Sequence, residues 1–139
     1  MERDGAKVGI FHNYSRGVRS LTRISPKGAF KASGTYRPGA SISAIIIGDG
    51  QIRVYAVNDD NELVETAYSS EAWGPTNALT KTATDSGLAA IHFVKEGGEL
   101  NINVFFQPIA FEYIPQRLVW DGKWVPETDK ILIYPPSKK

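Results

Sequence analysis

The sequence of 139 residues contains no cysteine and only two histidines. Without cysteine there is no disulfide framework and no thiolate metal site, and two isolated histidines do not form a metal-ligand cluster. No residues are spaced as a nucleophile with its base or as a pair of catalytic carboxylates, and no glycine-rich phosphate loop is present. We therefore expect a protein that is not an enzyme and that uses no cofactor and no metal.

An excess of charge of one sign is also missing. Lysine and arginine number 16 and aspartate and glutamate 15, a net charge of +1 without any basic block, so we expect no nucleic acid partner. No apolar run reaches membrane-spanning length, so no membrane insertion is expected. Met1 to Asp4 do not resemble a signal peptide. We expect a cytoplasmic location or release without a signal peptide, and an extracellular one if the chain is a processed or trimmed form.

What the sequence does contain predicts an all-β domain. It has 13 glycines, 8 prolines and 11% aromatic residues, with hardly any helical periodicity. The clearest stretch predicts strands over 43–47, 51–57, 62–68 and 71–73, the last ending at Gly74-Pro75 before a connection over 76–87. Asn58 to Asn61 form a turn between the second and third strands. A turn with three free residues would pair Arg53 directly with Glu65 on one face, whereas a four-residue turn would place them on opposite faces.

The same strand pattern occurs again along the chain. Residues 89–94 echo 43–47, residues 102–107 echo 52–57, and residues 8–13 are a fainter third copy. Self-similarity at roughly 40–50 residues is typical of propellers and other repeat folds. We predict a β-propeller-type array of about three four-stranded antiparallel blades in a single domain, 1–139. Its units are approximately 41–78, 88–127 and 7–36, the last closed by a strand within 130–135 (Ile131 to Tyr134).

Three features together resemble the fungal and bacterial fucose-binding β-propeller lectins. They are the run Ile52-Arg53-Val54-Tyr55, a glutamate twelve positions after its arginine, and Trp120-Asp121-Gly122-Lys123-Trp124 one unit later. The resemblance covers about residues 41–134 and implies a six-bladed ring, built from one chain or several short ones, with sugar sites in clefts between adjacent blades. It implies fucose-containing glycans as partners. Within the site it implies that Arg53 and Glu65 form a polar clamp, Trp124 and Trp120 a stacking wall, and Ile102 and Leu100 an apolar floor for the methyl group of the sugar.

One alternative function remains open. In the third unit Asn103 stands at the arginine position and Pro115 at the glutamate position, so only the middle unit keeps the full set. Without its aromatic neighbours, the Arg53–Glu65 pair is better interpreted as an ordinary cross-strand ion pair, which contributes about 0.2–1 kcal/mol. With the run from Trp120 to Trp124 one unit later, the ion-pair and the ligand-site interpretations are balanced. A degenerate propeller that serves as a protein-interaction or structural scaffold, without sugar binding, is therefore the alternative to a lectin.

Three blades cannot close a ring, which bears on assembly. An open arc would leave apolar sheet faces bare, and we expect Val8, Ile10, Val104 and Phe106 among the residues at risk of exposure. Patches of that size are rare on monomers. We therefore expect a homodimer in which two three-bladed chains join head to tail into a six-bladed ring.

Overall fold

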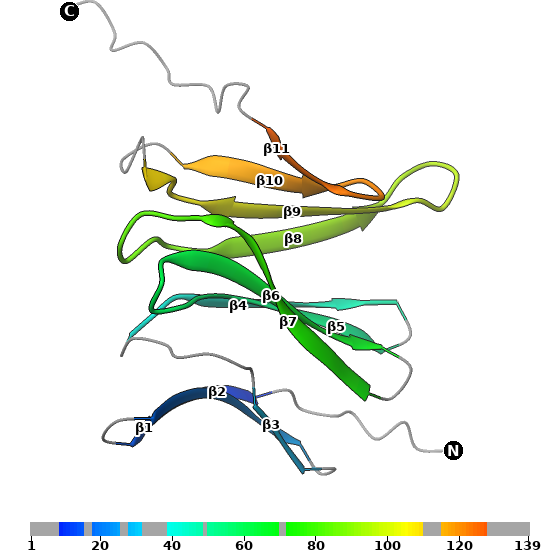
Figure 1. Ribbon diagram of the computed structural model, residues 1–139. Helices are drawn as coiled ribbons and strands as arrows, with labels where there is room; N and C mark the ends of the chain where they lie inside the picture. Colours follow the sequence, from blue (N-terminus) through cyan, green and yellow to red (C-terminus); the bar gives the residue numbers. More distant parts are fainter. Residues whose placement is uncertain are drawn as a thin grey trace, which may run out of the picture.

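The computed structural model describes residues 9–15, 18–25, 28–31, 39–48, 50–69, 72–109 and 115–127, with side chains from residue 39 to residue 126. The regular elements in these ranges are all strands, which form three antiparallel sheets stacked in chain order (Figure 1). In the part of the chain so described, no helix is long and apolar enough to cross a membrane. The predicted all-β class is confirmed.

We name the sheets by their place in the chain. The N-terminal sheet contains β1 (Gly9–Ser15), β2 (Val18–Ser25) and β3 (Gly28–Lys31). The middle sheet contains β4 (Ile42–Ile47), β5 (Gln51–Val57), β6 (Glu62–Ser69) and β7 (Ala72–Lys81). The C-terminal sheet contains β8 (Ala89–Val94), β9 (Leu100–Phe106), β10 (Gln116–Trp120) and β11 (Trp124–Glu127). Each sheet is a meander in which strands adjacent in sequence are hydrogen-bonded neighbours. The strand expected at 131–134 lies outside the described residues.

A shared apolar core joins the middle sheet to the C-terminal sheet. Because successive side chains on a strand point to opposite faces, one alternating set from each sheet faces the other sheet. The buried members of this core are Ile45, Ile47, Tyr55 and Leu63 from the middle sheet, and Ile102, Val104, Phe106 and Leu118 from the C-terminal sheet. The inner strands are joined as well, since the Ala90 amide donates to the Ser43 hydroxyl at 3.0 Å. The two sheets therefore pack face to face.

The predicted exposure of Val104 and Phe106 is wrong. Their side chains are only 0% and 3% exposed, because they lie on the face of β9 that packs against the middle sheet. The other face of the C-terminal sheet is the open one, and it carries exposed Ile91, Phe93 and Val125. Val8 and the side chain of Ile10 fall outside the described residues.

The β5–β6 turn is longer than the predicted three residues. Val57 pairs with Leu63, so Arg53 stands opposite Ala67 and Glu65 opposite Tyr55, and the predicted direct Arg53–Glu65 pairing is wrong. The Asn58 side-chain oxygen accepts hydrogen bonds from the amides of Asp60 and Glu62, at 3.0 and 2.9 Å. These bonds stabilise a turn with five residues between the paired positions Val57 and Leu63. Asn61 provides the left-handed backbone that this turn requires, with a φ of 56°.

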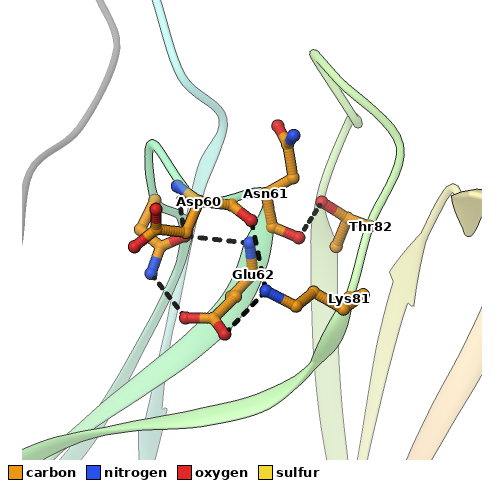
Figure 2. Close-up of polar contacts among 6 residues, drawn as sticks. Asp60, Asn61, Glu62, Lys81 and Thr82 are labelled. Carbon is orange, nitrogen blue, oxygen red and sulfur yellow. Dashed lines mark hydrogen bonds and ion pairs between the residues drawn. The ribbon is translucent and has the colours of Figure 1, made fainter.

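Contacts to β7 and its end fix the same turn in place (Figure 2). The Lys81 ammonium lies 3.0 Å from a Glu62 carboxylate oxygen, and the Thr82 amide donates to the Asn61 carbonyl at 2.8 Å. The register error amounts to two residues, which is one full period of a strand. Arg53 and Glu65 therefore still share a face, as diagonal neighbours.

Strand β7 is also longer than predicted. It does not end at Gly74-Pro75 but continues to Lys81, paired with β6 across two shifts of register. One of these shifts lies between Thr66 and Tyr68, opposite the Gly-Pro step. A proline without an amide hydrogen is tolerated in an outermost strand and at a bulge, and both conditions hold here.

Candidate functional site

Arg53 and Glu65 form a half-buried ion pair on the face of the middle sheet that meets the C-terminal sheet. The Arg53 Nε and the Glu65 Oε2 atoms are 4.0 Å apart, and the side chains are 19% and 14% exposed. The other contacts of Arg53 are long: Nη1 donates to the Ile52 carbonyl at 3.4 Å and Nη2 to the Gln51 side chain at 3.3 Å. A guanidinium has five N–H donors, so this one keeps donor capacity for another partner.

Tyr55 lies directly opposite Glu65 in the strand register. Its hydroxyl donates to Glu65 Oε2 at 2.8 Å, and its side chain is fully buried, with 0% exposure. Among the side chains that the structure describes, this hydroxyl is the one hydrogen-bond donor to Glu65, and it leaves the Oε1 atom without a donor. The carboxylate is therefore held at one oxygen only.

Two tryptophans reach the same place from the C-terminal sheet. Trp120 and Trp124 are paired across β10 and β11 at the ends of the Asp121–Lys123 turn, and their ring centroids are 5.5 Å apart. Trp124 meets the edge of Tyr55 from the facing sheet, with centroids 6.0 Å apart and an interplanar angle of 86°. Both indoles are half-buried, so each keeps exposed ring surface. Tyr55 therefore contacts both Glu65 of the ion pair and Trp124 of the facing sheet.

Of the two aliphatic side chains assigned to the site, Ile102 lies in the core. It stands opposite Trp120 in register and is only 2% exposed. Leu100, two residues earlier on the same face of β9, is partly buried and packs against that core. Ile102 therefore supports Trp120 from within the sheet junction. Of the two residues, Leu100 is the one with exposed surface that a ligand can contact.

Burial dominates the electrostatics of this cluster. It raises the pKa of the Glu65 carboxyl above its usual value, while the hydrogen bond from Tyr55 and the positive charge of Arg53 act in the opposite direction. Burial likewise raises the pKa of the Tyr55 hydroxyl far above its usual range, and the negative charge of Glu65 adds to that effect. Tyr55 is therefore a proton donor over the whole range in which the protein would work.

Tyr55 is absent from the residues that the sequence assigned to the site, although a signal for it exists. It follows Arg53 by two positions in a predicted strand, and such residues point to the same face. In the described part of the chain there is no group of three or more histidine, aspartate or glutamate residues that could hold a metal ion. The residues assigned to the site and Tyr55 include one cation, one anion, one phenol and two indoles, which can make polar and stacking contacts with a ligand.

No model of a known protein family matches the chain. Over 84 residues, or 53% of the chain, the sequence is 37% identical to the fucose-specific lectin of Aleuria aurantia, and this match spans 25% of that lectin. The chain thus spans about a quarter of the curated relative that it matches.

Solved structures show the same fold. A fucose lectin from Kordia zhangzhouensis, solved in complex with methyl-fucoside, aligns with a TM-score of 0.60 at 20% identity, over 88% of this chain and 89% of that one. The Aleuria aurantia lectin, described as a six-bladed β-propeller, aligns with a TM-score of 0.58 at 24% identity, over 88% of this chain and 48% of that one. The chain is therefore similar to fucose lectins, in sequence over about half of its length and in fold over most of it.

Proposed function

We propose that the chain is a carbohydrate-binding lectin, not an enzyme, and that it binds fucose or a fucosylated glycan between the middle and C-terminal sheets. One observation carries the proposal: the half-buried Arg53–Glu65 pair is incompletely hydrogen-bonded, and Tyr55, which donates to Glu65, packs on the half-buried Trp124 of the facing sheet. Removing charges from water costs free energy that packing alone does not return. Polar groups retained at such a place are typical of ligand sites.

The chemistry of a deoxysugar suits these groups. Vicinal hydroxyls both donate and accept, so Arg53 can donate to them while Glu65 Oε1 accepts from them. The C–H-rich face of the ring can lie on Trp124 or Trp120, and the methyl group can lie against Leu100. The similarity to fucose lectins, one of which is matched over 89% of its length and was solved with methyl-fucoside, supports fucose as the first ligand to test.

Arg53→Ala tests the site. A hydrogen bond to a charged group contributes about 1.5–3 kcal/mol, so we expect the affinity for methyl-fucoside to fall by roughly 10- to 150-fold in a titration followed by tryptophan fluorescence. Lys81→Ala is the matched control, because Lys81 is also a cation paired with a glutamate of the middle sheet, but at the β5–β6 turn. We expect that variant to bind as the unaltered chain does.

Two results would contradict the proposal. If Arg53→Ala binds methyl-fucoside as tightly as the unaltered chain, the sugar contacts other residues. If the unaltered chain binds no fucoside and no glycan on an array, the scaffold function is the better description.

We also propose that two chains form a homodimer that completes a six-bladed ring. Support comes from the open face of the C-terminal sheet, where Ile91, Phe93 and Val125 are 52%, 49% and 43% exposed. The same face carries Asn101 and Asn103, whose side chains are hydrogen-bonded to each other at 2.8 Å. Its exposed apolar side chains suit packing against another sheet, and the N-terminal sheet of a second copy would continue the stack of Figure 1.

The mass in solution tests this assembly. We expect sedimentation at micromolar concentration to give the mass of two chains, and Phe93→Glu to give the mass of one. Ile46→Glu is the control, because Ile46 is equally exposed, at 54%, but lies on the middle sheet. A single-chain mass for the unaltered protein would refute the dimer.

A further inference from the structure

Tyr55 occupies a position that packing alone does not explain. Its ring is buried in the core between the two sheets, where a phenylalanine would fill the same space. Its hydroxyl, however, is directed at Glu65 Oε2, 2.8 Å away, while its ring edge meets Trp124 of the facing sheet. One side chain thus contacts the polar part of the candidate site on the middle sheet and the aromatic part on the C-terminal sheet.

We propose that Tyr55 is a positioning residue of the sugar site. Its hydroxyl holds the Glu65 carboxylate in the orientation that directs Oε1 toward the ligand, and its ring packs on Trp124 and fixes the position of that indole. The proposal rests on the proposed function and deepens it. Tyr55 is 0% exposed, so it acts through these two neighbours and not by touching the sugar. It determines how the two halves of the site, which come from different sheets, stand relative to each other.

The geometry around Glu65 leaves this task to Tyr55. Arg53 lies 4.0 Å from the same oxygen, beyond hydrogen-bonding distance, so it attracts the carboxylate without fixing its direction. Asn77 stands opposite Glu65 on β7, but its amide donates to the Pro75 carbonyl at 3.4 Å. A free glutamate side chain would sample several rotamers, and each binding event would have to restrict it again.

The pH dependence of binding gives a readout that a purely structural role would not change. Glu65 accepts hydrogen bonds from a sugar at Oε1 more strongly when it is ionised, and the Tyr55 hydrogen bond favours the ionised form. On its own sheet, the charged or titratable neighbours of Glu65 are Arg53 and Tyr55 of β5. On the facing sheet, His92 lies on the side of β8 that faces the core. The charge that acts on Glu65 is that of Arg53. Loss of the Tyr55 hydroxyl should therefore move the acid limb of binding, the pH range in which affinity falls as Glu65 is protonated, to higher pH.

Tyr55→Phe in the full chain is the direct experiment. It removes one oxygen atom and keeps the ring that packs on Trp124. We expect the dissociation constant for methyl-fucoside to rise about tenfold at neutral pH, and the acid limb of binding to shift upward. In a Glu65→Gln background, the same change should leave the pH dependence of binding unmoved, because the titrating carboxyl is gone. Tyr68→Phe is the matched control, since Tyr68 belongs to the same sheet but packs on Trp73.

The outcomes separate this inference from the proposed function. If Tyr55→Phe binds methyl-fucoside with unchanged affinity and an unchanged acid limb, Tyr55 is a core residue only and the inference is wrong. If the unaltered chain binds no fucoside, or Arg53→Ala binds normally, the proposed function itself has failed. If Tyr55→Phe does not fold, 3-fluorotyrosine at position 55 keeps the shape of the side chain and makes its hydroxyl a stronger hydrogen-bond donor. The acid limb of binding must then move to lower pH, and an acid limb that does not move overturns the inference.

Discussion

Replacement of Ile102 by alanine separates two roles for this residue that predict opposite results. The sequence assigned Ile102 to the apolar floor beneath a sugar, whereas the structure places it in the core with 2% exposure, paired with Trp120 on one side and His92 on the other. As a core residue it contributes to the stability of the junction between the sheets. As a ligand contact it would contribute to affinity.

The size of the effect follows from burial. Ile102→Ala removes three carbon atoms that are almost completely buried, which at about 0.8 kcal/mol per methylene is roughly 2.4 kcal/mol of transfer free energy. The cavity that remains adds to this, and such substitutions cost about 2–5 kcal/mol in total. With a urea m-value of about 2 kcal/mol per molar, a loss of about 3 kcal/mol lowers the unfolding midpoint by roughly 1.5 M.

The assay is urea unfolding followed by tryptophan fluorescence, at one fixed protein concentration because assembly would shift the midpoint. Ile46→Ala is the control: Ile46 is 54% exposed, and we expect a change within about 0.5 kcal/mol. If Ile102→Ala leaves the midpoint unchanged and instead weakens the binding of methyl-fucoside, Ile102 contacts the ligand and its assignment to the core is wrong.

Two further predictions concern the polar residues of the middle sheet. Burial raises the folded-state pKa of Glu65 above its usual value of 4.5, so the folded state binds this proton more tightly than the unfolded state does. The free energy of unfolding should therefore fall as pH rises above 4.5. Glu65→Gln should remove this part of the pH dependence in unfolding titrations, and an unchanged profile would contradict the prediction. Asn58→Ala should lower the free energy of unfolding by about 1–3 kcal/mol, because it leaves the amides of Asp60 and Glu62 without their acceptor; chemical denaturation measures this, and a loss below about 0.5 kcal/mol would mean that the turn does not depend on the cap.

The sheets could be predicted from the sequence because their signals are local. Alternating β-branched and aromatic residues bounded by Gly-Asp-Gly and Asn-Asp turns determine both the strands and the faces of their side chains. The exact pairing could not be predicted, because the length of the β5–β6 turn depends on hydrogen bonds from Asn58 and on the left-handed backbone at Asn61. The residue types indicate that a turn is present, but they do not determine how many residues it contains.

The arrangement of the candidate site residues was predicted in part, for a related reason, while their role in binding stays a prediction. Arg53 and Glu65 were expected on one face and are found there, because a register error of two residues preserves the face. The role of Ile102 could not be read from its residue type, since an isoleucine beneath an indole and an isoleucine beneath a sugar occur in the same strand pattern. Burial distinguishes them, and burial depends on how the two sheets pack.

Two charged residues interrupt the apolar face of the middle sheet, and they mark the proposed site. On β5 the face toward the C-terminal sheet runs from Val57 through Tyr55 to Arg53, and on β6 it runs from Leu63 through Glu65 to Ala67. On β4 the same face carries the buried core residues Ile45 and Ile47. A junction built only for packing gains stability if apolar side chains continue to its end. Here the face carries a half-buried ion pair instead, at a cost in desolvation that a bound polyhydroxylated ligand can offset.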